Sequence, residues 1–134
     1  MQNFQLNSHM MTLSGVFYPK GFVVIMFPSA DDAEQVASEI SRDHPADGDV
    51  MQLSPETVLR EIGKIEGESD VQLPSVGTEA ATVRKYVDLA RAGHCALMVR
   101  VHSDAETERV MEAARKASFS YAQRYHLLAI EDLE

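Results

Sequence analysis

The sequence repeats itself once, at an offset of 74 residues, so that residues 22–59 align with residues 96–133. In each copy a run of β-branched and other apolar residues is followed by a serine and then by apolar residues at helical spacing. Such a run predicts a strand, and the spacing predicts an amphipathic helix. Each copy therefore predicts a strand–helix–strand (βαβ) unit, and the fold must accommodate two of them.

The helices of both copies are expected to begin at equivalent positions. Ser29 is followed by Asp32, and Ser103 is followed by Glu106, in each case three residues later. In a capping box of this kind the serine and the acidic side chain satisfy backbone N–H groups at the start of the helix. The matched caps indicate an internal repeat rather than a chance likeness of two βαβ units.

Two further helices are predicted between the copies. The first begins at Ser54-Pro55, where proline suits the first helical position, and ends at Gly67. The second covers residues 78–92 and is followed by Gly93, which suits a left-handed C-terminal cap. Residues 68–77, between these helices, read as a linker.

This order of elements predicts an α+β fold, namely a ferredoxin-like sandwich of two βαβ repeats with two extra helices inserted between them. Its sheet is antiparallel and four-stranded, with the first strand between the third and the last and both repeat helices on one face. The alternative is a small doubly wound parallel sheet with helices on both faces. The symmetry of the repeat, and the lack of a glycine-rich loop after either opening strand, favour the sandwich.

One domain is expected over residues 19–134. It consists of repeat 1 (about 22–59), a helical insert (about 60–92) and repeat 2 (about 96–133). Residues 1–18 are interpreted as a leader. Within it Ser8-His9-Met10 resembles a cloning-vector junction, and a native, poorly ordered leader is the alternative.

Composition narrows the function classes. The 134 residues include 21 acidic and 12 basic ones, and the net charge of −9 argues against sequence-independent binding to nucleic-acid phosphates. The single cysteine excludes an internal disulfide and a cysteine-pair metal site, and it suits the reducing cytoplasm. No apolar run approaches the roughly 18 residues of a membrane span. We therefore expect a soluble, cytoplasmic protein with neither a nucleic-acid nor a membrane partner.

Alternation along the strands assigns side chains to two faces of the sheet. One face is apolar and is expected to contact the repeat helices; it comprises Val23, Ile25, Phe27, Met51, Leu53, Leu97, Val99, Val101, Tyr125 and Leu127. The opposite face contains no carboxylate; it comprises Val24, Met26, Gln52, Met98, Arg100, His102, Arg124, His126 and Leu128. Its arginines and histidines all come from the second copy.

The first hypothesis for this opposite face is that it is covered, either by the inserted helices or by a second subunit. In a homodimer or a complex with another partner, the interface would comprise Val24, Met26, Met98 and Leu128. Methionine and arginine are enriched in such interfaces.

Two other hypotheses remain open for the same face. In one, Arg100, His102, Arg124 and His126 surround a small anionic ligand, with arginine making a two-point contact to a carboxylate or phosphate. In the other, His102 and His126 take part in catalysis or metal binding. Two strand spacings, roughly 10 Å, would separate these histidines, which is too far for one metal ion. No metal, cofactor or catalytic residue is therefore assigned.

Two other features have plain structural interpretations. Cys95 falls on the buried side of its strand and is interpreted as a small core residue. The acidic residues within 31–39 and 104–112 are interpreted as solvated helix faces that place negative charge near helix N-termini. A partner-binding surface is the alternative for these acidic residues.

Two short segments resemble a known family. Val24-Ile25-Met26-Phe27-Pro28-Ser29, continuing to Glu34, and Gly93-His94-Cys95-Ala96-Leu97-Met98-Val99, continuing to Glu106, are similar to segments of the general stress protein 17M-like, or heat-induced stress protein, family. The resemblance implies a soluble, bacterial, stress-associated protein. It supplies no catalytic residue.

The sequence thus predicts a small non-enzymatic domain, a homodimer or partner-binding module that uses the carboxylate-free sheet face. A regulator that binds a small anionic ligand through the four cationic and titratable residues is the alternative. A dimeric ferredoxin-like enzyme is the second alternative, and it rests on fold analogy alone.

Overall fold

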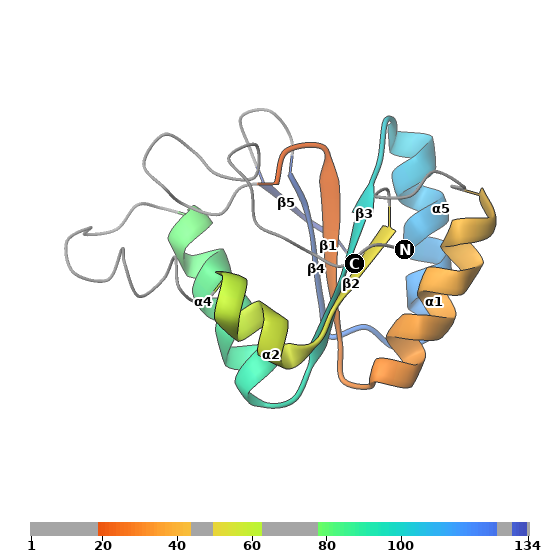
Figure 1. Ribbon diagram of the computed structural model, residues 1–134. Coiled ribbons are helices and arrows are strands. Elements are labelled where there is room, and N and C mark those ends of the chain that lie inside the picture. The colour runs from red at the N-terminus through yellow and green to blue at the C-terminus, as the bar shows by residue number, and fades with distance from the viewer. Residues whose placement is uncertain (1–18, 44–49, 63–77, 126–129, 134) are drawn as a thin grey trace.

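The computed structural model describes residues 19–43, 50–62, 78–125 and 130–133 (Figure 1). The leader (1–18) and the linker (68–77) that the sequence predicts lie outside these residues. The elements follow in the order β1 (Phe22–Phe27), α1 (Ala30–Asp43), β2 (Val50–Leu53), α2 (Pro55–Thr57), the π-helix η2 (Val58–Ile62), α4 (Thr78–Arg91), β3 (Cys95–Arg100), α5 (Asp104–Arg115), β4 (Tyr121–Tyr125) and β5 (Ile130–Asp132).

The strands form one five-stranded sheet in the order β2-β3-β1-β4-β5, and every neighbouring pair is antiparallel. The predicted α+β class is confirmed, and the parallel-sheet alternative is wrong. β1 lies between β3 and β4, whereas the sequence predicted it between the third strand and the last, so the strand order differs from the predicted one. The sheet also has five strands rather than the predicted four, because β5 pairs with β4 at its edge.

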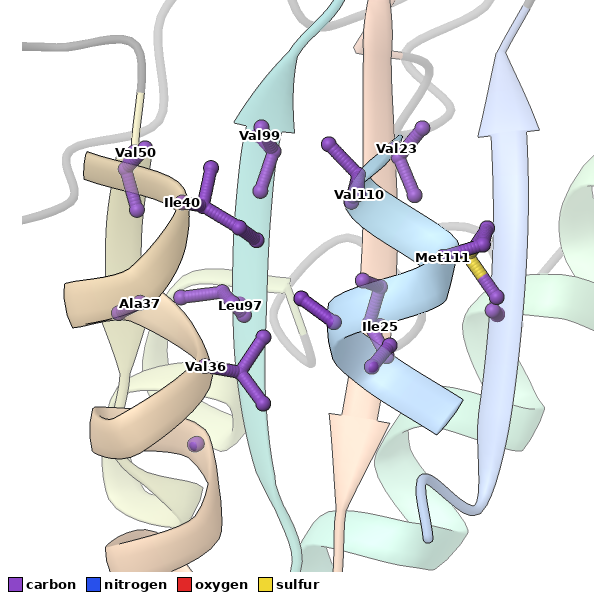
Figure 2. Close-up of a cluster of buried hydrophobic side chains, with 14 of the residues drawn as sticks. Val23, Ile25, Val36, Ala37, Ile40, Val50, Leu97, Val99, Val110 and Met111 are labelled. Atoms are coloured by element: carbon purple, nitrogen blue, oxygen red, sulfur yellow. The ribbon is translucent and has the colours of Figure 1, made fainter. Parts of the chain in front are cut away.

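Helices cover both faces of the sheet. Figure 1 shows α1 and α5 together on one side and α2 and α4 on the other. On the α1/α5 side, Val36 and Ile40 of α1 and Val110 of α5 are buried against strand residues such as Ile25 and Leu97 (Figure 2). These helix residues recur at the apolar spacing that predicted them.

The face that the sequence left open is covered by the inserted helices of the same chain. Val24, Met26 and Met98 each have 0% of their surface exposed. They belong to one apolar cluster with helix residues of α4 and η2, among them Tyr86 and Ile62. The proposed homodimer interface is therefore wrong for these three residues, because the chain itself occupies that face; Leu128 lies outside the described residues.

The repeat is a structural one. Val24 pairs across β1 and β3 with Met98, its own equivalent at the offset of 74, so a local two-fold axis passes between them. Helices α1 and α5 begin at Ala30 and Asp104, which are also 74 residues apart. The second strands of the two repeats, β2 and β4, follow a different offset. Val50 of β2 pairs with Val99, and Ala122 of β4 pairs with Ile25, the equivalent of Val99 in the first copy. Val50 and Ala122 are therefore structurally equivalent, although they are 72 rather than 74 residues apart.

The register corrects two assignments of side chains to faces. Met51 pairs with Met98, and Met51, Leu53 and Tyr125 all join the cluster under the inserted helices rather than the α1/α5 cluster. Directly opposed residues share a face of the sheet. The faces that the sequence analysis assigned to the side chains of β2 and β4 are therefore exchanged in the structure. Gln52 consequently faces α1, where its side-chain amide donates to the carbonyl oxygen of Ala30 at 3.5 Å.

Helix α4 ends as the sequence predicts. Gly93 has a φ of +96°, and the N–H groups of Gly93 and His94 donate to the carbonyls of Ala90 and Leu89 at 2.9 and 3.0 Å. This is a Schellman motif, in which a left-handed residue closes the helix. At the end of α5 the left-handed residue is Ser118, with a φ of +56°.

Replacing Gly93 by alanine is expected to destabilise the fold by about 1 kcal/mol, because a Cβ disfavours the left-handed conformation. No atom lies within 4 Å of the added Cβ, so strain of the backbone is the cause rather than a clash. The matched change is Ser118→Gly, which relieves that conformation and should be neutral or stabilising. Urea unfolding of both variants measures the difference. A Gly93→Ala variant as stable as the wild type would contradict the left-handed cap.

Candidate functional site

The structure separates Arg100 from Arg124, two of the four predicted ligand residues. Arg124 pairs with Val23 across β1 and β4, and Val23 faces α1 and α5. Arg100 stands opposite Phe22, which lies in the cluster under the inserted helices. The two arginines therefore project from opposite faces of the sheet and do not hold one anion between them.

Arg124 connects β4 to the start of α5. Its guanidinium donates to Asp104 at 2.5 Å, and its side chain is 13% exposed, whereas that of Asp104 is 96% exposed. Asp104 is the first residue of α5, where a carboxylate also interacts favourably with the helix dipole. Because Asp104 stays in water, the pair contributes no more than about 1 kcal/mol. The pair links β4 to the first turn of α5.

Arg100 packs on an aromatic ring at the end of β3. Its guanidinium carbon lies 4.7 Å from the centroid of the Phe22 ring, the arrangement of a cation–π contact. At the same corner Gly21 accepts from the N–H of Val101 and donates its own N–H to Tyr125, both at 2.9 Å. Gly21 has a φ of +85°, which glycine adopts without strain. This corner joins β3 and β4 to the start of β1.

His102 lies beside the N-terminus of α5, in an exposed position. Its backbone N–H donates to the Glu106 carboxylate at 3.2 Å, and Ser103, the N-cap, accepts from the N–H of Glu106 at 3.1 Å. The capping box predicted from the sequence is thereby confirmed in the second copy. In the first copy Ser29 accepts from the N–H of Asp32 at 3.4 Å. His126 lies outside the described residues.

A second polar group lies at the end of the sheet where β1 finishes. His94 Nδ1 is 2.8 Å from the Ser120 hydroxyl, and that hydroxyl donates to the carbonyl oxygen of Met26 at 3.0 Å. Either the Nδ1–H of His94 or the Ser120 hydroxyl donates in this contact, according to the tautomer of the ring. Ser120 also donates its backbone N–H to Met26 at 2.7 Å. The sequence gave no sign of this contact between His94 and Ser120.

Cys95 is a core residue, as predicted. It is 2% exposed, and its thiol lies 3.7 Å from the carbonyl oxygens of Phe27 and Ser29. Burial raises the pKa of the Cys95 thiol; a backbone hydrogen bond opposes this, and the Asp32 carboxylate adds to it. The thiol is consequently a poor nucleophile at neutral pH.

Alkylation of Cys95 with iodoacetamide is expected to be slow in the native protein and to require unfolding. At pH 7 the rate of alkylation should be more than about 100-fold below that of the urea-unfolded chain, since native proteins expose their cores only rarely. The raised pKa of the Cys95 thiol has a second consequence: the free energy of unfolding falls as the pH rises, because the thiol ionises at a lower pH in the unfolded chain than in the folded one. Stoichiometric labelling of the native protein within the mixing time would contradict this burial.

Three tyrosines form a cluster between α4 and β4 that sequence reasoning missed. The hydroxyls of Tyr86 and Tyr125 are 2.8 Å apart, and both residues are buried. The rings of Tyr86 and Tyr121 meet edge to face, with centroids 5.7 Å apart. The Lys85 ammonium lies 5.7 Å from the centroid of the Tyr121 ring. In the sequence, Tyr86 falls on the apolar face of its helix, and this spacing is the signal that could have indicated its burial.

Negative charge is concentrated in one helical layer. Helices α1 and α5 together carry nine acidic and three basic residues, whereas α2, η2 and α4 together carry four of each. The exposed acids of the first layer are Asp31, Glu34, Asp104, Glu108 and Glu112. We call the outward side of α1 and α5 that these residues mark the acidic surface.

Ion pairs neutralise only part of the acidic surface. Lys116 bridges the two helices by donating to Glu39 at 3.3 Å, and Arg115 donates to Glu108 at 2.7 Å. The hydrogen bond from Arg115 lowers the pKa of Glu108. Within the described part of the chain, Asp31 and Glu34 form no ion pair. These two carboxylates project from the first two turns of α1.

Comparison of the chain with protein-family models, curated proteins and solved structures gave no match. Among the residues that the structure describes, no three histidine, cysteine or acidic side chains gather as metal ligands would. None of the described helices is long and apolar enough to cross a membrane.

Proposed function

We propose that this protein is a non-enzymatic domain that binds a basic partner through the acidic surface of α1 and α5. The observation that carries the proposal is the charge asymmetry between the two helical layers. Charge complementarity of this kind steers association and selects partners by sign. The sheet face, which was the first candidate for binding, is occupied by the inserted helices.

The positions of the reactive side chains favour binding over catalysis. The Cys95 thiol is buried, the His94–Ser120 pair is bonded to the backbone of β1, and Arg124 is paired with Asp104. Each of these groups stabilises the junction of a strand with a helix or a neighbouring strand. A catalytic nucleophile instead needs an accessible position beside a base.

A basic partner is favoured over a second copy of the chain on this surface. Two copies that met through α1 and α5 would each bring a net charge of about −6 from these helices, and like charges brought together at an interface cost several kcal/mol. We therefore propose that any self-association uses another surface.

We further propose that the fold is an elaborated ferredoxin-like sandwich, with β5 and the inserted helices added to the two βαβ repeats. The position of β1 between β3 and β4 supports this relationship. The cytoplasmic location and the bacterial stress-associated role remain proposals, and the latter rests on the short segments that resemble the stress-protein family.

The test uses a fluorescent oligolysine peptide as the probe of basic chemistry. Asp31→Lys/Glu34→Lys reverses two charges on the acidic surface, and Glu56→Lys/Asp88→Lys makes the same change in net charge on the other helical layer. All four residues are exposed. We expect the first double variant to weaken binding at least about tenfold in about 0.1 M salt and the second to weaken it less than about threefold, because the field of an exposed charge fades within the Debye length, which is about 10 Å at that salt concentration.

Equal weakening by the two double variants would show that only net charge matters, and it would overturn the acidic surface as a binding site. Raising the salt concentration should weaken binding of the wild type whether the two double variants differ or not. Circular dichroism of each variant checks that the fold is retained.

A further inference from the structure

We draw no further inference here: the strongest candidate, the polar cluster of His94, Cys95 and Ser120 at the end of the sheet where β1 finishes, carries nothing because the His94 ring is bonded to Ser120, Ser120 is bonded to the backbone of β1, and Cys95 is a lone buried cysteine with no second feature beside it that points to a ligand.

Discussion

Met98→Asp is expected to unfold the protein rather than to dissociate a dimer. Met98 is fully buried at the local two-fold axis, between β1 on one side and β2 on the other, and beneath the inserted helices. An aspartate there would place a carboxylate in an apolar cluster, which costs several kcal/mol in a domain whose total stability is about 5–15 kcal/mol. Far-ultraviolet circular dichroism should show loss of the native spectrum.

Met98→Ala keeps this test informative if the aspartate variant cannot be purified. It should lower the free energy of unfolding by about 2–5 kcal/mol, the usual cost of truncating a buried methionine. The matched control is Leu59→Ala on η2, where the side chain is 36% exposed and the change should stay within about 1 kcal/mol. A Met98→Asp variant that stays folded but sediments as a smaller species than the wild type would restore the interface hypothesis.

Tyr86→Ala should be the second most damaging change. Tyr86 is fully buried, packs edge to face on Tyr121 and bonds through its hydroxyl to Tyr125. Truncation of a buried aromatic side chain costs about 3–5 kcal/mol. Since the tyrosine cluster anchors α4 to the sheet, hydrogen exchange of the α4 amides should accelerate more than that of β1 and β3.

Tyr86→Phe separates the ring from the hydroxyl. It retains the packing and removes only the bond to Tyr125, so it should cost about 1–2 kcal/mol. A double-mutant cycle with Tyr125→Phe should give a coupling energy of about 1 kcal/mol. If Tyr86→Ala cost no more than Tyr86→Phe, the ring would not be an anchor of α4.

Local signals in the sequence predicted the starts and ends of helices well. The capping serines at 29 and 103, the proline at the start of α2 and the glycine after α4 each specify a backbone conformation through their own chemistry. The alternation in the two long central strands was also sufficient, because β1 and β3 are continuous and regular. β5 was not predicted as a separate strand, because it is only three residues long.

The assignment of faces failed in β2 and β4 for a physical reason. A shift of one residue in a short strand moves every side chain to the opposite face, and the turns that fix the register carry little signal in the sequence. That error assigned Arg124 to the same face as Arg100, whereas the structure places the two arginines on opposite faces of the sheet. It also obscured the partners of Tyr125.

The coverage of the sheet was harder still to predict. Apolar stripes on the inserted helices show that these helices pack against something, but they do not say which face receives them. A second subunit would bury the same strand residues. The acidic surface, in contrast, could be predicted as a set of residues, although not as one side of the molecule until α1 and α5 were placed together.

The intramolecular cover over Met98 is tested most directly by nuclear Overhauser spectroscopy on a mixture of labelled and unlabelled protein. Isotope filtering separates contacts within one chain from contacts between chains. The structure predicts intramolecular cross-peaks between the rings of Tyr86 and Tyr121, whose centroids are 5.7 Å apart, and between η2 or α4 side chains and the methyl group of Met98. Cross-peaks from Met98 that appear only between chains would contradict the intramolecular cover. They would show that a second subunit covers this face of the sheet.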